Sequence, residues 1–528
     1  MTDPARTAAV ILAAGTASRF GAAKVFAPLG DRPLVDRVID AAAAAGLGEI
    51  VVVLGPASPA EASADLDRVR VVRNPRPEDG LSGSVRIGLA ALGADVDAAL
   101  VLLGDQPLVS PIVIRALLDA KVPAGRSIVV PRYAGGGGQN PTLVLRDGWT
   151  LADDLTGDRG FGPLIAARPA LVVEVAADGS NPDVDTPGDL SLVAWAVQVR
   201  ANREQVDRVR EVGDGDFYAT TTSLFRADPR RPDVEDATLA VLRATARSGE
   251  TWLDIGAGAG RYALPLALAV GPAGEVIAVE TSPGMLGALR EGLADHEIAN
   301  VHVIDGRWPL NEGVLPMPAA DVALIAHVGY DIEAIGPFVD AMEAAARRLC
   351  VAVMMERTPA SVAEPFWPPV HGEERIPLPA LPAFVELLQA RGRAPEVRMV
   401  ERGDRSFPDR DGALGFLRRQ TWVAPDGDKD RRLQAELDER LLPRPDGTVG
   451  LRDVPDLAVG VITWEPTGRP AAPVWSGVRS EARDDELGQG LLAGFQSCSQ
   501  RRSDARTRER VRYRWSWMRR TASFTAGA

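Results

Sequence analysis

The sequence predicts an α/β protein with two domains, each built on a doubly wound and mainly parallel sheet. Two apolar runs, Ala8–Ala14 and Thr251–Ile255, each stop at a glycine-rich turn that a helical stretch follows. This order is typical of the first βα unit of such a sheet, where backbone amides and a helix N-terminus form a phosphate or nucleotide site. Because the chain has 528 residues, two or more domains are expected.

The composition favours a globular protein with ordinary hydrophobic cores. Hydrophobic residues make up 46% and charged residues 25%, and the net charge of −13 leaves no global basic field for nucleic acid or a membrane surface. Cys350 and Cys498 allow at most one disulfide and no cysteine-built zinc site, which fits a reducing compartment. The N-terminus does not resemble a signal peptide, and no run of about 18 apolar residues occurs. We expect a soluble, cytoplasmic protein.

The predicted strands of the first domain, residues 1–197, are separated by helical stretches. They are Ala8–Ala14, Ile50–Leu54, Val69–Val72, Ala98–Leu103, Ser127–Val130 and Leu171–Val175. A polar, charged segment follows, and we expect residues 198–212 to be a linker.

Residues 213–466 repeat the alternation, so both domains are predicted to be Rossmann-like. The predicted strands here are Thr251–Ile255, Glu275–Val279, Val301–Ile304, Asp321–Ile325, Val351–Met355 and Ala458–Trp464.

The final stretch, residues 467–528, has a different character. Residues 501–528 hold nine arginines and two tryptophans without apolar periodicity. We expect a disordered basic tail. Contact with RNA or an acidic partner, or translation past a shifted reading frame, are the alternatives.

The first chemical constellation follows the strand that ends in Leu12-Ala13-Ala14. Gly15 and Ser18 allow backbone amides to approach a triphosphate, while Arg19 and Lys24 can neutralise the charge that moves to the leaving pyrophosphate. The spacing differs from that of a P-loop. An ordinary βα turn with surface cations is the alternative for this motif taken alone.

Two aspartates complete this constellation. Asp105 follows the strand Leu100–Leu103, and Asp185 precedes a helix that starts with proline. Both are expected at the ligand-binding end of the sheet, where they could share one Mg²⁺ with nucleotide phosphates. An aspartate at a strand end is otherwise a turn or helix cap.

These motifs resemble those of the MobA-like nucleotidyltransferases, and most closely the molybdenum cofactor cytidylyltransferases, over residues 6–197. The resemblance rests on LAAG-x-x-S-R-F-G-x-x-K, the segment Gly80–Leu89, GDQP, Asn140-Pro141, Gly157–Gly160 and DVDTPGDL, in this order. It implies Mg²⁺-dependent transfer of a nucleotidyl group from an NTP to a phosphorylated acceptor, such as molybdopterin, with release of pyrophosphate.

The resemblance also implies roles for individual residues. Leu12, Ala13, Ala14 and Gly15 belong to the nucleotide-binding segment. Gly15, Ser18, Arg19 and Lys24 hold the triphosphate, and Asp105 and Asp185 hold the metal. The sequence LAAG favours CTP, since relatives that use GTP tend to read LAGG. Ala17 departs from the Gly or Ser of many relatives. Small-molecule substrates and molybdoenzyme maturation proteins are the implied partners, and a GTP-using guanylyltransferase is the alternative.

The second chemical constellation is Asp254-Ile255-Gly256-Ala257-Gly258-Ala259-Gly260, with Glu280 at the end of the next strand. A carboxylate at that position accepts hydrogen bonds from ribose hydroxyls, and the glycines let the chain pass beneath a ligand. NAD and S-adenosylmethionine (SAM) are both candidates. The third glycine follows one residue after the second, whereas dinucleotide sites favour two intervening residues.

Residues 213–466 resemble class I SAM-dependent methyltransferases. The motifs are LDIGAGAGR, VIAVETSPGML, Val303–Gly306 and Asp321–Ile325. The resemblance implies that Asp254 and the glycine loop lie by the methionine part, that Glu280 binds ribose, and that Asp305 caps the adenine amine. His327 or Asp331 could act as a general base, or only shape the acceptor pocket.

The sequence therefore predicts a bifunctional transferase. A regulatory or scaffold protein that binds nucleotide and SAM without turnover is the alternative from another class. Retention of the charged members of both sites favours an enzyme.

Overall fold

The structure is a computed structural model, and it describes ten stretches of the chain. They are residues 2–15, 24–56, 58, 63–134, 138–213, 228–230, 236–310, 317–400, 406–455 and 457–467. The predicted tail lies outside the described residues except for Thr467. No helix in the described stretches combines the length and apolar character that crossing a membrane requires.

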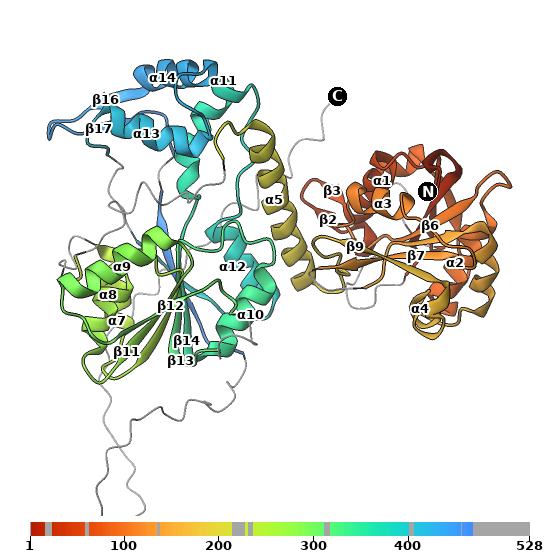
Figure 1. The fold of residues 1–528 in the computed structure, drawn as a ribbon, viewed down its shortest axis with the longest axis horizontal. Coiled ribbons are helices and arrows are strands. Elements are labelled where there is room, and N and C mark those ends of the chain that lie inside the picture. Colours follow the sequence, from red (N-terminus) through yellow and green to blue (C-terminus); the bar gives the residue numbers. More distant parts are fainter. Residues whose placement is uncertain are drawn as a thin grey trace, which may run out of the picture. The chain divides into compact units, whose positions relative to one another are not determined.

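The N-terminal sheet has seven strands in the order β5-β4-β1-β6-β8-β7-β9. Figure 1 labels β6, β7 and β9 of this sheet. All neighbouring pairs are parallel except those that β8 makes with β6 and β7. The strands are β1 (Thr7–Ala13), β4 (Glu49–Leu54), β5 (Arg70–Arg73), β6 (Ala98–Leu103), β7 (Ile128–Tyr133), β8 (Thr142–Leu145) and β9 (Val172–Ala177).

Helices cover both faces of this sheet, so it is doubly wound as predicted. Alternate residues of β1 point to opposite faces, where Ala9 and Ile11 pack with α1 and α3 and Ala8 and Val10 pack with α2 and α4. Because both faces are buried, β1 is apolar throughout. The helices are α1 (Leu34–Ala44), α2 (Leu81–Ala90), α3 (Pro111–Leu118) and α4 (Gly162–Ala167).

The second sheet also has seven strands, in the order β12-β11-β10-β13-β14-β18-β15. β18 runs antiparallel to β14 and β15, and the other neighbouring pairs are parallel. The strands are β10 (Thr251–Ile255), β11 (Glu275–Glu280), β12 (Val301–Asp305), β13 (Ala320–Ala326), β14 (Ala346–Met355), β15 (Glu396–Val400) and β18 (Val459–Trp464).

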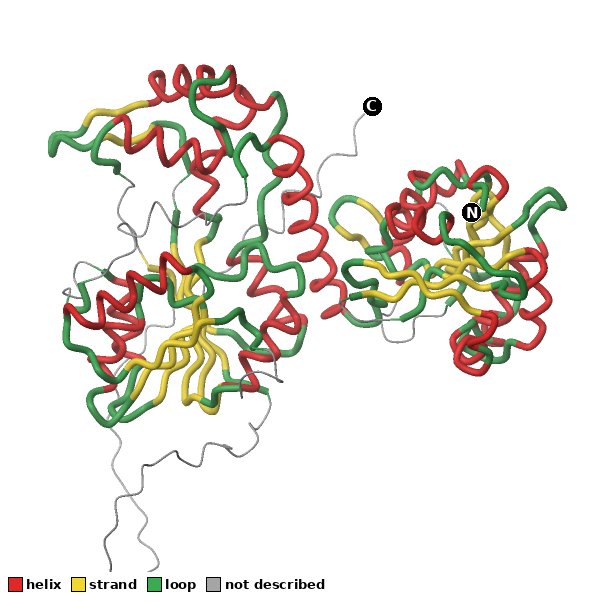
Figure 2. The backbone as a smooth tube through the Cα atoms, in the orientation of Figure 1, coloured by secondary structure: helices red, strands yellow, loops and turns green. Residues whose placement is uncertain are grey.

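The second sheet is covered on both faces as well (Figure 2). Leu253 packs with the helices of one face and Trp252 with those of the other. The first group is α5 (Pro187–Val209), α10 (Ile335–Ala345) and α12 (Leu381–Ala390). The second group is α7 (Ala237–Thr245), α8 (Ala263–Val270) and α9 (Pro283–Asp295).

Helix α5 includes most of the segment predicted as a linker, residues 198–212. Trp195 Nε1 donates to the Ile332 carbonyl at 2.9 Å, and Gln205 Nε2 donates to the Glu374 carbonyl at 2.7 Å. The charged residues of this segment therefore lie on a packed helix, and the domain boundaries stay a prediction.

Two insertions form a helical unit that the sequence did not predict. It comprises η9 (Pro359–Phe366), α11 (Trp367–His371), α13 (Arg410–Thr421), α14 (Asp428–Arg440) and the hairpin β16 (Leu441–Pro443) and β17 (Val449–Leu451). One insertion follows β14 and the other follows β15. These two strands run in the same direction, because both are antiparallel to β18, so both insertions emerge at the carboxyl edge of the second sheet. Phe366 and Leu417, one from each insertion, share a hydrophobic core there.

Candidate active sites

The first candidate site begins where β1 meets the loop after β6. The Gly104 amide donates to the Leu12 carbonyl at 2.9 Å. A Cβ atom at Gly104 would lie 3.2 Å from both the Leu12 oxygen and the Ala13 Cβ atom, so this approach favours small residues. The predicted nucleotide-binding segment, whose last residue Gly15 is exposed, therefore adjoins the loop that carries Asp105. Ala14 is buried, and Ser18 and Arg19 lie outside the described residues.

Three predicted site residues meet here although they are far apart in the sequence. The Lys24 ammonium lies 2.6 Å from Asp105 Oδ2 and 2.5 Å from Asp185 Oδ1. The side chains of Lys24 and Asp105 are each 18% exposed, while that of Asp185 is 54% exposed. The structure thus brings both predicted metal ligands to one cation.

Backbone contacts fix the two aspartates relative to each other. The Val184 amide donates to the Asp105 carbonyl at 3.0 Å. Asp189 Oδ2 accepts from the amides of Asp185 at 3.1 Å and Thr186 at 2.8 Å, and the Thr186 hydroxyl caps helix α5 in return. This capping box holds Asp185 immediately before the helix.

The carboxylates suit a hard divalent cation. Burial alone would lower the pKa of Lys24, but hydrogen bonds to Asp105 and Asp185 outweigh burial and raise it. The ammonium therefore occupies a position from which a positive charge contacts both carboxylates. Two carboxylates together with phosphate oxygens are the ligands that Mg²⁺ commonly takes, so these residues fit the metal that the sequence predicts.

A chain of hydrogen bonds next to this site, here called the polar relay, was not predicted from the sequence. Asn181 Nδ2 donates to Gln106 Oε1 at 3.1 Å, and Gln106 Nε2 donates to Asp183 Oδ1 at 2.8 Å. Asn181 and Gln106 are buried. Burial, followed by the charge of Asp105, raises the pKa of Asp183. The relay links the GDQP loop to the segment before α5, and two of its members, Gln106 and Asp183, belong to the motifs GDQP and DVDTPGDL.

Two further motifs of the family resemblance pack against each other. Asp158 Oδ1 accepts from the Leu81 amide at 3.2 Å, at the N-terminus of α2. Gly80 has a φ of 85°, and a Cβ atom there would lie 2.5 Å from the Gly157 carbonyl carbon. Both the backbone conformation and the lack of space therefore require glycine at position 80.

The second candidate site is the loop between β10 and α8. Gly256, Gly258 and Gly260 all have positive φ values, of 73°, 56° and 86°. A Cβ atom at Gly256 would lie 2.6 Å from Val328, and one at Gly260 would lie 2.1 Å from Leu264. The loop therefore needs glycine for its backbone and for packing, and Gly258 has open space beside it.

Glu280 holds this loop through its carboxylate. Glu280 Oε2 accepts from the Gly258 amide at 2.8 Å, while Oε1 accepts from the amides of Thr281 at 2.8 Å and Ser282 at 2.7 Å. Asp305 is its register partner on β12 and is exposed. Both acids thus lie at the carboxyl edge of the sheet. Glu280 orders the loop in addition to its predicted contact with ribose.

Asp254 is a buried carboxylate, 1% exposed, whose oxygens make no hydrogen bond of good geometry with the described residues. Only a weak contact with the backbone amide of Ala263 acts to lower its pKa. Burial, followed by the charge of Glu280, raises its pKa to about 7. A buried carboxyl in this state takes up a proton or hydrogen-bond donors from a ligand, which fits a cationic ligand beside the glycine loop.

The candidate acceptor loop follows β13. His327 has a φ of 58°, and its amide donates to the Val353 carbonyl at 2.8 Å. The Tyr330 hydroxyl accepts from the Met355 amide at 2.8 Å, so it ties this loop to the end of β14. Asp331 is exposed. A general-base role for His327 or Asp331 stays a prediction.

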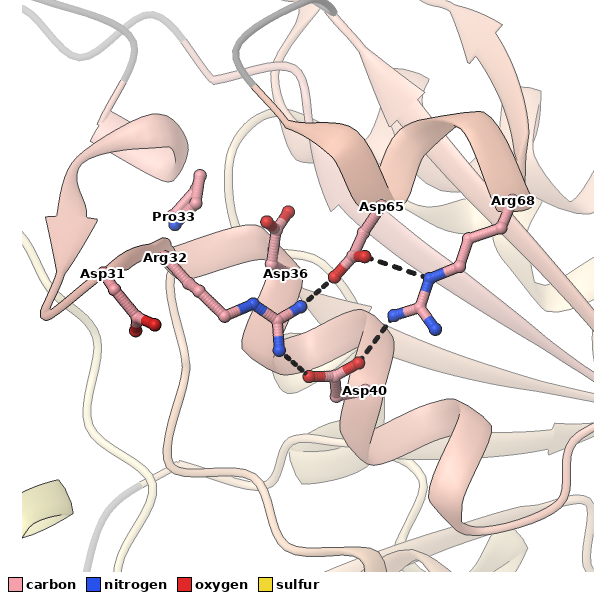
Figure 3. Close-up of a pocket in the computed structure, with 7 residues that line it drawn as sticks. All are labelled: Asp31, Arg32, Pro33, Asp36, Asp40, Asp65 and Arg68. Atoms are coloured by element: carbon pink, nitrogen blue, oxygen red, sulfur yellow. Dashed lines mark hydrogen bonds and ion pairs between the residues drawn. The ribbon is translucent and has the colours of Figure 1, made fainter. Parts of the chain in front are cut away.

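A hollow of about 650 Å³ lies elsewhere, beside α1. Figure 3 shows Arg32 between Asp40 and Asp65, and Arg68 reaching the same two carboxylates. Burial alone would raise the pKa of Asp40, but hydrogen bonds from both arginines lower it. In this hollow, Arg32 and Arg68 are therefore paired with Asp40 and Asp65.

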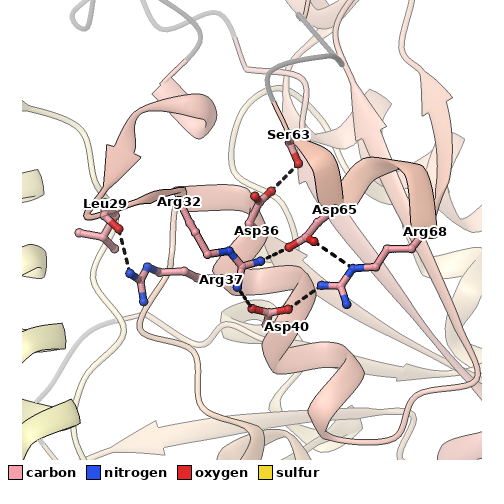
Figure 4. Close-up of polar contacts among 8 residues, drawn as sticks. All are labelled: Leu29, Arg32, Asp36, Arg37, Asp40, Ser63, Asp65 and Arg68. Atoms are coloured by element: carbon pink, nitrogen blue, oxygen red, sulfur yellow. Dashed lines mark hydrogen bonds and ion pairs between the residues drawn. The ribbon is translucent and has the colours of Figure 1, made fainter. Parts of the chain in front are cut away.

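Two further polar contacts lie near this hollow. Figure 4 shows Ser63 donating to Asp36, and Arg37 donating to the Leu29 carbonyl at 2.8 Å. Burial raises the pKa of Asp36. The hollow contains none of the predicted site residues.

In comparisons with known proteins, different families match the two halves of the chain. A family model described as MobA-like NTP transferase domain matches residues 9–172, and one described as methyltransferase domain matches residues 253–350. The first domain implies an NTP as substrate and the second implies SAM.

Similar proteins include two that carry the name bifunctional protein GlmU. That of Kineococcus radiotolerans is 33% identical over 242 residues, 43% of this chain and 44% of the relative. That of Halorhodospira halophila is 40% identical over 228 residues, 42% of this chain and 43% of the relative. The chain therefore spans less than half of either protein.

A solved structure, Rv0371c from Mycobacterium tuberculosis, is 34% identical with a TM-score of 0.31, and the match covers 35% of this chain and 94% of that one. The two family matches show that this chain carries a MobA-like NTP transferase domain followed by a methyltransferase domain.

Proposed function

We propose that the first domain transfers a nucleotidyl group from CTP to a phosphorylated acceptor such as molybdopterin, with Mg²⁺ and release of pyrophosphate. The observation that carries this proposal is the convergence of Asp105 and Asp185 on one cation, 2.6 and 2.5 Å from the Lys24 ammonium. A simple helix cap or turn would not require two carboxylates from distant segments to share a positive charge.

The chain's own residues position the reactants. Asp105 and Asp185 would hold Mg²⁺, which when bound would supply charge neutralisation at the phosphates. The amides of the loop that ends at Gly15 approach the triphosphate, and Arg19 and Lys24 offset the charge of the leaving pyrophosphate. The acceptor phosphate attacks the α-phosphorus and the bond to the pyrophosphate breaks. Such a displacement needs alignment and charge stabilisation, and no protein nucleophile.

The preference for CTP rests on Ala13 and Ala14, the second and third residues of LAAG. Ala14 is buried, so its methyl group takes up space that a glycine would leave open. GTP use is the alternative. Molybdoenzyme maturation proteins are the expected partners, and nucleic acid is not expected for a chain of net charge −13.

We propose that the second domain binds SAM through Asp254, the glycine loop, Glu280 and Asp305, and transfers its methyl group to an acceptor near His327. Support comes from the buried carboxylate of Asp254, which makes no hydrogen bond of good geometry with the described residues, and from the two acids at the ends of β11 and β12. Methyl transfer from a sulfonium is a displacement at an activated carbon, so alignment of the acceptor is the main requirement.

The test is to incubate the full chain with each NTP, Mg²⁺ and a panel of phosphorylated acceptors that includes molybdopterin, and to measure pyrophosphate. We expect release that needs CTP, metal and one acceptor together. Binding of CTP and SAM without pyrophosphate release on any acceptor would favour the scaffold alternative. Binding of NADH in place of SAM would show that the second cofactor is wrong.

A further inference from the structure

We propose that Lys24 is the resting counter-ion of the metal site: without nucleotide its ammonium takes the cation position between Asp105 and Asp185, and a divalent cation enters only when it leaves. This inference rests on the proposed nucleotidyl transfer. It assigns Lys24 two successive positions, at the carboxylates first and at the phosphates after the nucleotide has bound.

The position of Lys24 is set by its neighbours along the chain. Val25 is 5% exposed, and a Cβ atom at Gly104 would lie 3.3 Å from Val25 Cγ1. Packing of Val25 therefore holds the Lys24 backbone beside the loop that carries Asp105. The flexible side chain of Lys24 can leave the carboxylates without a change in the fold.

The Lys24 ammonium and a divalent cation cannot lie between Asp105 and Asp185 at the same time, because their positive charges repel each other. The ammonium contacts one oxygen of each carboxylate at 2.6 and 2.5 Å. A metal bound by Asp105 and Asp185 would lie within a few ångströms of that ammonium, where two cations repel strongly in a half-buried site. With the ammonium in place the three groups carry one net negative charge, and without it they carry two.

Nucleotide binding would then draw Lys24 away. A triphosphate offers a larger negative charge than the carboxylate pair, and it also supplies oxygen ligands to the metal. Metal and nucleotide should therefore bind cooperatively, and each should raise the affinity of the other by the same factor.

The test measures binding of Mn²⁺ to the nucleotide-free full chain by calorimetry. Lys24→Met and Lys24→Gln remove the competing charge, so both variants should bind Mn²⁺ at least tenfold more tightly than the wild type, which is about 1.4 kcal/mol. Lys24→Arg keeps a cation and should bind Mn²⁺ as weakly as the wild type. The matched control is Lys121→Met, at an exposed lysine outside the site, and it should change nothing.

A second measurement follows the cooperativity. The factor by which CTP increases Mn²⁺ affinity should be smaller in Lys24→Met than in the wild type, because the lysine no longer has to move. Unfolding midpoints of all variants, compared with the wild type, show that each is folded.

Two results would overturn the inference in different ways. If Lys24→Met and Lys24→Gln bind Mn²⁺ no more tightly than the wild type, while Asp105→Asn abolishes binding, Lys24 does not compete and the proposed metal site stands. If neither the wild type nor any variant binds Mn²⁺, even with CTP present, both the inference and the proposed metal site fail.

Discussion

Protonation of Asp254 should control the binding of SAM. The pKa of this carboxyl is raised from 3.8 to about 7, first by burial and then by the charge of Glu280. Between pH 3.8 and about pH 7, the folded protein holds a proton on Asp254 that the unfolded chain releases. The stability of the folded protein therefore falls as the pH rises through this range. Above the upper value the ionised carboxylate costs about 4 kcal/mol relative to the same group in water.

A cationic ligand shifts the protonation equilibrium of Asp254 in the opposite direction, because its charge favours the ionised carboxylate. We expect the affinity for SAM to fall about tenfold for each pH unit below the pKa of Asp254. Binding at about pH 6 should release close to one proton, since Asp254 is mostly protonated before SAM binds and ionised afterwards. Asp254→Asn should bind SAM weakly at every pH, and its unfolding midpoint above neutral pH should exceed that of the wild type.

Calorimetric titrations of the full chain with SAM, in buffers of different ionisation enthalpy, measure both the affinity and the proton release. The matched control is Asp295→Asn, at an exposed aspartate near the end of α9, and it should behave as the wild type. The reasoning is refuted if Asp254→Asn shows the same pH dependence and proton release as the wild type.

Three further predictions concern both sites. Asp105→Asn and Asp185→Asn should each abolish pyrophosphate release without shifting the unfolding midpoint by more than the exposed control Asp119→Asn, and full release by both would reject the shared metal. Glu280→Ala should weaken SAM binding at least about tenfold relative to the exposed control Glu386→Ala. The substitution removes three charge-assisted hydrogen bonds of about 1.5–3 kcal/mol each. Unchanged affinity for SAM in calorimetry would contradict this prediction. Steady-state kcat/KM should be higher with CTP than with GTP, and an equal or higher value with GTP would overturn the proposed base preference.

The parallel strands were predictable because their burial leaves a clear pattern in the sequence. A strand covered on both faces, such as β1, is a continuous apolar run. β15 escaped prediction because it is an edge strand, Glu396–Val400, with charged residues at alternate positions and mostly exposed side chains. β8 has only four residues and follows Asn140-Pro141, so its apolar run was too short to separate from a loop.

The membership of the first site was predictable, but its arrangement was not. Their expected positions at the ligand-binding end of the sheet and the family resemblance placed Lys24, Asp105 and Asp185 in one site, yet the ammonium was expected at the phosphates. Only the tertiary structure places it between carboxylates that lie 81 and 161 residues further along the chain. The relay through Gln106 and Asn181 escaped prediction for the same reason, since neutral amides give no charge signal in the sequence.

The central claim is that the first domain moves a nucleotidyl group from an NTP to a phosphorylated acceptor with the metal bound by Asp105 and Asp185. The most direct measurement uses CTP radiolabelled at the α-phosphate, with Mg²⁺ and molybdopterin, and follows the label by chromatography. The account predicts that label joins the acceptor in the wild type and that the Asp105→Asn, Asp185→Asn double variant transfers none. Label that stays in CTP with the wild type, or transfer by the double variant at the wild-type rate, would contradict it.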